Sequence, residues 1–124
     1  MNFTANFLFS DSDEVSVTAG LADDQFDTKQ YILFERNLRP SEQDQRLGHD
    51  QPRFELNDQY LSAYGDIESV RLDQEYLDVT FKTPPKFGLK TLAVRIGNGN
   101  GIDALADGLK KIFGECFVDC RTSS

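Results

Sequence analysis

The stretch Ile102–Phe113, which reads IDALADGLKKIF, points most directly to the fold. Its apolar side chains recur with the 3.6-residue period of an α-helix and form one stripe: Ile102, Leu105, Ala106, Leu109, Ile112 and Phe113. Asn100 is placed to cap the start of this helix, and Gly114 fits the left-handed position after its end. A stripe this wide needs a second apolar layer, so the rest of the chain is expected to supply a sheet.

Working back towards the N-terminus, apolar and polar residues alternate with the two-residue period of β-strands. Strands are expected at residues 3–9, 15–21, 31–34, 53–56, 69–72, 76–82 and 92–96. Asp11-Ser12-Asp13 has turn chemistry, so the first two strands are expected to form a hairpin. The sequence therefore predicts an α+β fold, a largely antiparallel sheet of six or seven strands with the C-terminal amphipathic helix packed on one face. Residues 38–52 and 58–66 are expected to be irregular. The first of these segments is expected to be a mobile loop or a binding loop.

Length and composition indicate one folded domain. The chain has 124 residues, 39% of them hydrophobic and 11% aromatic, which is enough to build a core without disulfides or metals. The domain is expected to span residues 1–114, followed by a C-terminal tail at 115–124. The N-terminus has no secretory signal pattern and no apolar run could span a bilayer, so a cytoplasmic location is expected.

Charge excludes several classes of partner. The net charge is −8, which repels nucleic acids and anionic membranes. Acidic residues concentrate in residues 1–62, with twelve acids against five bases, whereas residues 63–124 hold nine and eight. The chain is therefore expected to have an acidic side built from its first half.

No motif predicts catalysis, a cofactor or a metal. Asp11-Ser12-Asp13 resembles the start of a calcium loop, but Ser16 and Ala22 stand where such a loop needs Gly and Glu. The run GNGNG at 97–101 lacks the Lys and Ser/Thr of a phosphate loop, and His49 is the only histidine. A magnesium site made of carboxylates alone stays open at this point. Cys116 and Cys120 would lie ~13 Å apart on a strand, too far for a disulfide, and are expected to be reduced.

The surface residues give three alternatives. In the first, Asp23, Asp24 and Asp27 join the segment 42–50 in an acidic docking patch that steers a basic partner. The candidates for docking are Asp23, Asp24, Asp27, Glu42, Asp44, Asp50, Tyr60, Tyr64, Asp66 and Glu68. The second is a small enzyme or ligand-binding domain with a pocket between sheet and helix. The third is an oligomerisation module that associates through a sheet edge or a tyrosine-bearing face.

The order of several short segments resembles a known family. GLADD at 20–24, YILFER at 31–36, ELND at 55–58 and YGDIE at 64–68, followed by a hairpin and a final strand and helix, resemble the Immunity protein 10 family of bacterial polymorphic toxin systems. The similarity runs from about Phe3 to Phe113. It implies a small cytoplasmic protein, encoded beside a toxin, that binds and blocks that toxin without a reaction or a cofactor. The acidity would suit a basic toxin such as a nuclease domain, docked on the first half or on residues 38–52.

Overall fold

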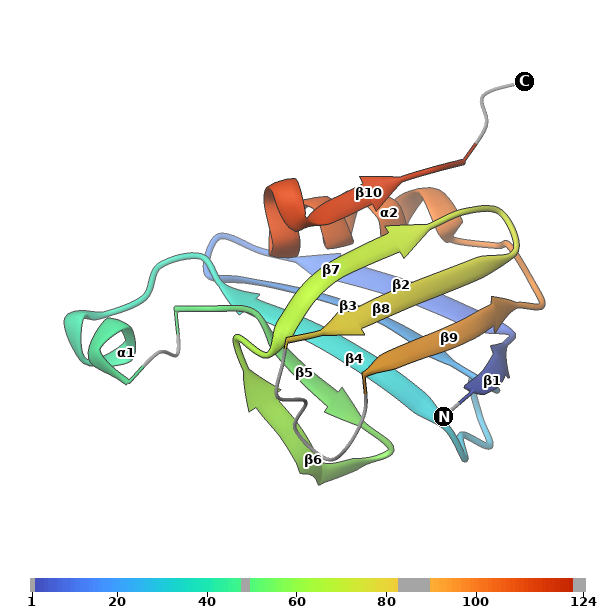
Figure 1. Ribbon diagram of the computed structural model, residues 1–124, viewed down its shortest axis with the longest axis horizontal. Helices are drawn as coiled ribbons and strands as arrows, with labels where there is room; N and C mark the ends of the chain where they lie inside the picture. Colours follow the sequence, from blue (N-terminus) through green and yellow to red (C-terminus); the bar gives the residue numbers. More distant parts are fainter. Residues whose placement is uncertain (1, 48–49, 83–89, 122–124) are drawn as a thin grey trace.

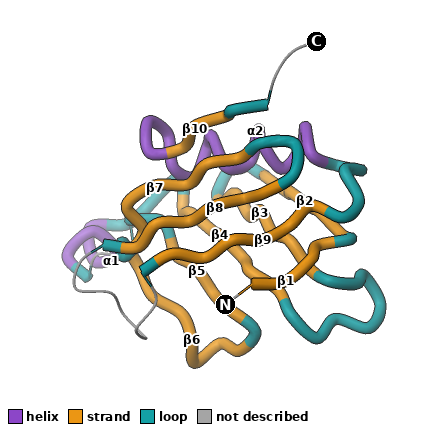
Figure 2. The backbone as a smooth tube through the Cα atoms, turned by 45° about the vertical axis from the view of Figure 1, so that its right-hand side comes forward, coloured by secondary structure: helices purple, strands orange, loops and turns teal. Residues whose placement is uncertain are grey.

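The computed structural model describes residues 2–47, 50–82 and 90–121. Over these residues the chain forms two five-stranded β-sheets and a long helix near the C-terminus. The two sheets lie as separate layers, with the helix along one edge of the pair (Figures 1 and 2). The sheets are named A and B below.

Sheet B is an antiparallel meander whose strands follow one another both along the chain and across the sheet. It contains β2 (Phe7–Ser12), β3 (Ser16–Ala22), β4 (Tyr31–Asn37), β5 (Arg53–Leu56) and β6 (Asp58–Tyr64). The short helix α1 (Glu42–Arg46) lies in the connection between β4 and β5. A register shift between Glu55 and Leu56, followed by Asn57 at φ 53°, turns the chain from β5 into β6.

Sheet A is assembled from distant parts of the chain in the order β1-β9-β8-β7-β10. It contains β1 (Asn2–Ala5), β7 (Ile67–Leu72), β8 (Tyr76–Phe81), β9 (Thr91–Ile96) and β10 (Phe117–Asp119). The three central strands are antiparallel. Both edge strands pair in parallel, β1 with β9 and β10 with β7.

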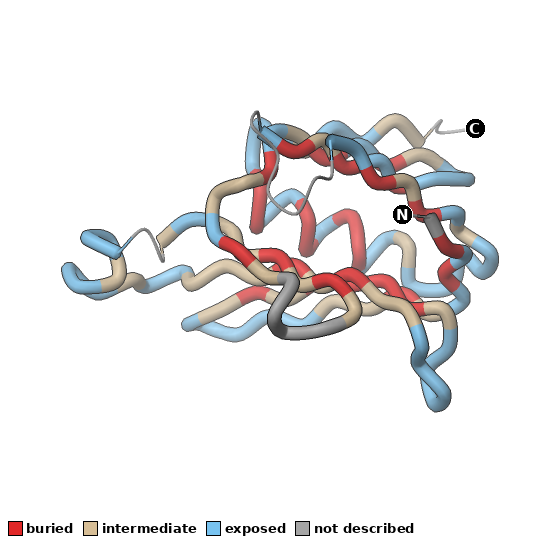
Figure 3. Tube along the Cα trace, turned by 60° about the horizontal axis from the view of Figure 1, so that its bottom comes forward, coloured by how far each residue is buried: buried red, intermediate tan, exposed pale blue. Residues whose placement is uncertain are grey.

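The core lies between the sheets and beneath the helix α2 (Ile102–Phe113) (Figure 3). Phe54 of sheet B meets Phe81 of sheet A edge to face, with ring centroids 5.2 Å apart. Along the β2 edge, α2 packs on the inner face of sheet B, where Phe113 makes an edge contact with Phe34 at 5.3 Å. Gly108 allows the helix to approach β2 and β3 closely, because a Cβ at that position would lie 2.2 Å from Ser10 Oγ and 3.2 Å from the Cβ of Ala19. The 3₁₀ turn η2 (Gly114–Cys116) then leads the chain into β10.

The predicted α+β class and the packed C-terminal helix are confirmed, but the single sheet of six or seven strands is wrong, because ten strands form two sheets. The expected strand 3–9 is two strands in different sheets. The chain changes sheet at Asn6, whose N–H donates to the carbonyl of Ala22 while the Gly97 N–H donates to the carbonyl of Ala5. This break shifts the alternation of inward-facing and outward-facing side chains by one residue. Leu8 is therefore buried, and Phe7 and Phe9 turn to the outer face.

Three further elements differ from the expectation. Residues 38–52 contain α1, and residues 58–64 form a strand instead of an irregular connection. Residues 117–119, expected in the tail, form β10 and extend sheet A. The residue that precedes α2 is Gly101 at φ 85°, without a side-chain cap, in place of the expected Asn100.

Candidate functional site

The outer face of sheet B, which no described element covers, carries apolar side chains. Phe7 and Phe9 are half-buried neighbours on β2, and their rings stack with centroids 5.4 Å apart. The ring of Phe9 lies across Gly20 of β3, where a Cβ would come within 2.4 Å of Phe9 Cζ. Glycine at this position therefore creates the shelf on which the aromatic pair rests. Leu33 of β4 continues the same row, because it pairs with Gly20 across the strands.

A hydrogen-bonded network links the outer sides of β4 and β5. The Tyr31 hydroxyl donates to Glu55 Oε2 at 2.5 Å, and Arg53 Nη2 lies 2.8 Å from Glu55 Oε1. The hydrogen bond from Tyr31, together with that from Arg53, holds the pKa of Glu55 below its ordinary value. Glu55 is therefore an ionised acceptor that stabilises this part of the face.

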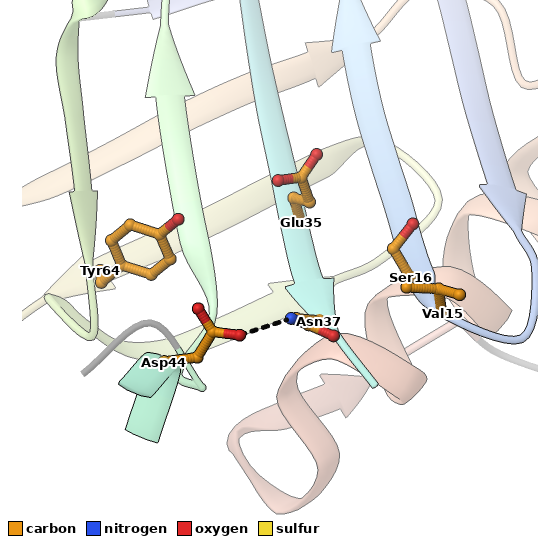
Figure 4. A pocket seen from close by; sticks show the side chains of 6 residues that line it. All are labelled: Val15, Ser16, Glu35, Asn37, Asp44 and Tyr64. Carbon is orange, nitrogen blue, oxygen red and sulfur yellow. Dashed lines mark hydrogen bonds between the residues drawn. The ribbon is translucent and has the colours of Figure 1, made fainter. Parts of the chain in front are cut away.

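A shallow pocket of about 260 Å³ lies at the end of sheet B nearest α1 (Figure 4). Its lining consists of Val15, Ser16, Glu35, Asn37, Asp44 and Tyr64. Asp44 belongs to the capping box of α1: its own N–H donates to Ser41 Oγ, and its Oδ2 accepts from the Ser41 N–H at 3.0 Å. Asn37 Nδ2 reaches the same oxygen at 3.4 Å. The pocket lining thus combines two carboxylates, an amide, a hydroxyl and a phenol ring, and the Asp44 carboxylate already accepts hydrogen bonds from Ser41 and Asn37.

The β3–β4 loop, residues 23–30, projects from the opposite end of sheet B and is held by its own side chains. Asp24 Oδ2 accepts the N–H of Asp27 at 2.9 Å, and Asp23 Oδ1 accepts the N–H of Lys29 at 3.0 Å. The bond from Lys29 is the main reason why the pKa of Asp23 is lowered. At the tip, the side chain of Phe26 is 90% exposed. Phe26 was not among the residues predicted from the sequence, although an isolated apolar residue within the polar run DDQFDT is a signal that could have indicated it.

The structure does not bring the two predicted halves of the acidic patch together. Asp23, Asp24 and Asp27 lie at one end of β4, and the segment 42–50 follows its other end, a strand length of about 20 Å away (Figure 1). The single patch is therefore wrong as an arrangement, because an antiparallel meander places successive connections at opposite ends of the sheet.

The remaining candidates lie towards the α1 end. Tyr64 pairs with Arg53 across the strands, and Asp66 and the exposed Glu68 follow in the connection to β7 and at its start. Asp50 is half-buried in the turn before β5. The side chain of Tyr60 and all of His49 lie outside the described residues.

A second groove, of about 340 Å³, lies between α2 and β10, where a pocket between helix and sheet was expected as an alternative. Arg121 at its edge makes ion pairs with Asp119 at 2.7 Å and with Asp103 at 2.6 Å. The hydrogen bond from Arg121 is the main cause that lowers the pKa of Asp119. The charged groups here bind one another and hold β10 against the helix.

Within residues 2–47, 50–82 and 90–121, no three His, Cys, Asp or Glu residues are grouped so as to hold a metal ion. None of the helices described is both long enough and apolar enough to cross a membrane. Cys116 is an exposed free thiol, and Cys120 is a half-buried one.

The described residues form a small two-layer α+β domain, and the outer face of sheet B carries the half-buried apolar row of Phe7, Phe9 and Leu33. Comparison with family models is more specific. The model described as Immunity protein 10 matches residues 3–94, and the chain belongs to this family. The resemblance seen in the sequence is thereby confirmed, with α2 and β10 lying beyond the matched range. No curated protein matched the chain.

Proposed function

We propose that this protein neutralises a bacterial toxin by binding it as a stoichiometric inhibitor in the cytoplasm, without catalysis or a cofactor. The observation that carries the proposal is the family match, which spans all of sheet B, all of β7 and β8, and most of β1 and β9 in sheet A. An inhibitor of this kind needs only a stable scaffold and a surface complementary to the toxin.

The distribution of charge over the two layers supports a basic toxin. Residues 7–64, which build sheet B, contain twelve acids and five bases, whereas residues 65–124 contain nine acids and eight bases. The sheet B layer thus carries most of the net charge of −8. A basic toxin such as a nuclease domain would be steered to this layer, and the protein itself would bind neither nucleic acid nor a membrane.

The two acidic regions at opposite ends of sheet B then act as separate parts of one long contact. The β3–β4 loop holds Asp23, Asp24 and Asp27, and the α1 end holds Glu42, Asp44 and Asp50. Tyr64 at the mouth of the pocket offers an aromatic surface beside the carboxylates of Glu35 and Asp44. A lysine or arginine of the toxin would find both a charge partner and a ring there.

Co-expression with the toxin encoded beside this gene tests the proposal. We expect growth rescue, co-purification of the two proteins, and loss of toxin activity in vitro that is complete at one inhibitor per toxin. The matched control is co-expression of the same toxin with an immunity protein from a different toxin system, produced at an equal level. Persistent toxicity in cells that contain soluble, folded protein would contradict the proposal.

A further inference from the structure

We infer that Phe26, at the tip of the β3–β4 loop, is an anchor that inserts into an apolar pocket with a basic rim on the toxin. The inference rests on the proposed function and names the part of the surface that contributes most to affinity. Phe26 is 90% exposed, more than any other large apolar residue among those described, and the next is Leu47 at 60%. An aromatic side chain in water does not contribute the favourable free energy that burial of its apolar surface provides. A partner that covers the ring on binding provides that free energy.

The loop is ordered before any partner arrives. Besides the two bonds that Asp23 and Asp24 accept, the Thr28 hydroxyl donates to the carbonyl of Asp24 at 2.5 Å. The Asp23 N–H donates to the carbonyl of Gln30 at 3.0 Å, which closes the base of the loop. A loop fixed in this way loses little conformational entropy on binding, so the contact made by Phe26 is not offset by the cost of ordering it.

The charged residues beside Phe26 indicate what kind of pocket on the toxin would bind its ring. Asp24 and Asp27 flank Phe26 and are exposed, and the neighbouring Lys29 forms only a long, exposed ion pair with Asp27, 3.8 Å between Nζ and Oδ2. The ring is thus surrounded by negative charge, and it fits a pocket whose rim carries lysine or arginine. An anionic lipid surface would be repelled by the same carboxylates.

The loop is continuous with the aromatic part of the sheet B outer face. The cross-strand row Phe7–Ala22–Tyr31 is the last row of sheet B before the loop. A partner that receives Phe26 would therefore extend over Phe7 and Phe9 in the same contact.

The test measures binding kinetics with a catalytically inactive form of the toxin domain encoded beside this gene. Phe26→Ala should raise Kd by about 30-fold or more, mainly through faster dissociation. Tyr76→Ala, which removes an exposed ring from the outer face of sheet A, is the matched control and should change Kd less than about threefold.

Asp27→Lys tests the charged rim and keeps the hydrogen bond of the loop at this position, because the Asp27 backbone N–H makes that bond and its carboxylate makes only the long, exposed ion pair with Lys29. We expect slower association, by about fivefold at low salt, and a weaker dependence on salt. Charge reversal at Asp23 or Asp24 would be ambiguous, since both carboxylates hold the loop.

The outcomes separate this inference from the proposed function. If the wild type binds the toxin and the Kd of Phe26→Ala lies within about threefold of the wild-type value, the inference that Phe26 is an anchor is overturned and the immunity role is unaffected. A wild-type dimer that Phe26→Ala dissociates, seen by sedimentation, would assign the residue to self-association and overturn the anchor as well. Absence of wild-type binding would overturn both.

Discussion

The two sheets share one core but differ on their outer faces. On sheet A, the outward side chains of β8 are Tyr76, Asp78 and Thr80, and those of the neighbouring β9 include Thr91 and Arg95. On sheet B, the corresponding positions hold the stacked Phe7 and Phe9 with Leu33 beside them. Sheet A thus exposes single apolar residues, Tyr76 and Val118, among polar ones, whereas sheet B gathers half-buried apolar side chains in one row, with the carboxylates of Asp11 and Glu35 nearer the α1 end. This difference is the reason for proposing the outer face of sheet B as the contact surface.

The largest effect is expected where the two layers meet. Phe54→Ala removes the ring that packs against Phe81 and should lower the free energy of unfolding by about 3–5 kcal/mol. Because both sheets share one core, chemical denaturation should still show one transition, at a lower midpoint. Thr80→Ala on the outer face of sheet A is the control and should change stability by less than about 0.5 kcal/mol. Two separate transitions would mean that the layers unfold independently.

Two charge-reversal variants test whether the sheet B layer contributes more than the sheet A layer to the rate of association with the toxin. Asp11→Lys changes the outer face of sheet B, and Glu75→Lys changes the β7–β8 turn of sheet A, with the same effect on net charge. Association with the toxin should slow by about fivefold for Asp11→Lys and by less than about twofold for Glu75→Lys. Stopped-flow measurements at low and physiological salt provide the check, because screening should reduce the difference. Equal effects would mean that only net charge matters.

The smallest effect concerns pH and the Tyr31–Glu55–Arg53 network. The folded pKa of Glu55 is below its unfolded value, so its contribution to stability is present above about pH 4.5 and is lost as pH falls through the folded pKa. Glu55→Gln should lower stability at pH 7 by about 1 kcal/mol and make the acid-side loss shallower. Denaturation at pH 7, 5 and 4 measures both quantities. Glu68→Gln, at an exposed position of β7, is the control and should leave both the stability at pH 7 and its loss at lower pH unchanged. If Glu55→Gln lost stability as steeply as the wild type when the pH falls, the network would not be the source of that loss.

The parts of the fold that were predictable are those with a regular period. The stripe from Ile102 to Phe113 predicted α2, the alternation predicted β3, β7, β8 and β9, and together they predicted the α+β class. The division into two sheets arises where the chain passes from one sheet to the other, at Asn6 and between β6 and β7, and around Asn6 the apolar pattern still resembles one strand. The short α1 and β10 have too few residues to show a period, and β10 is stabilised by pairing with β7, which is distant in the sequence.

The candidate site was less predictable for a related reason. Composition correctly showed that the first half is acidic, but the positions of Asp23 and Asp44 relative to each other follow from the meander, which sequence alone did not establish. The polar neighbours of Phe26 in DDQFDT were a weak signal of its exposure, because apolar residues are usually buried and the geometry of the loop is needed to show that this one is not.

The order of strands also has a consequence for synthesis on the ribosome. Every pairing in sheet B joins neighbours in the chain, so this meander can form as soon as residue 64 has emerged. Sheet A is different, because β1 pairs with β9 and β7 gains its outer neighbour only when β10 arrives. The part of the inner face along β2 that α2 covers therefore stays open until α2 has been made, although β7, β8 and β9 can already cover other parts of that face. A nascent chain arrested before residue 102 would leave Phe34 without its contact with Phe113, and chaperones would find apolar surface there.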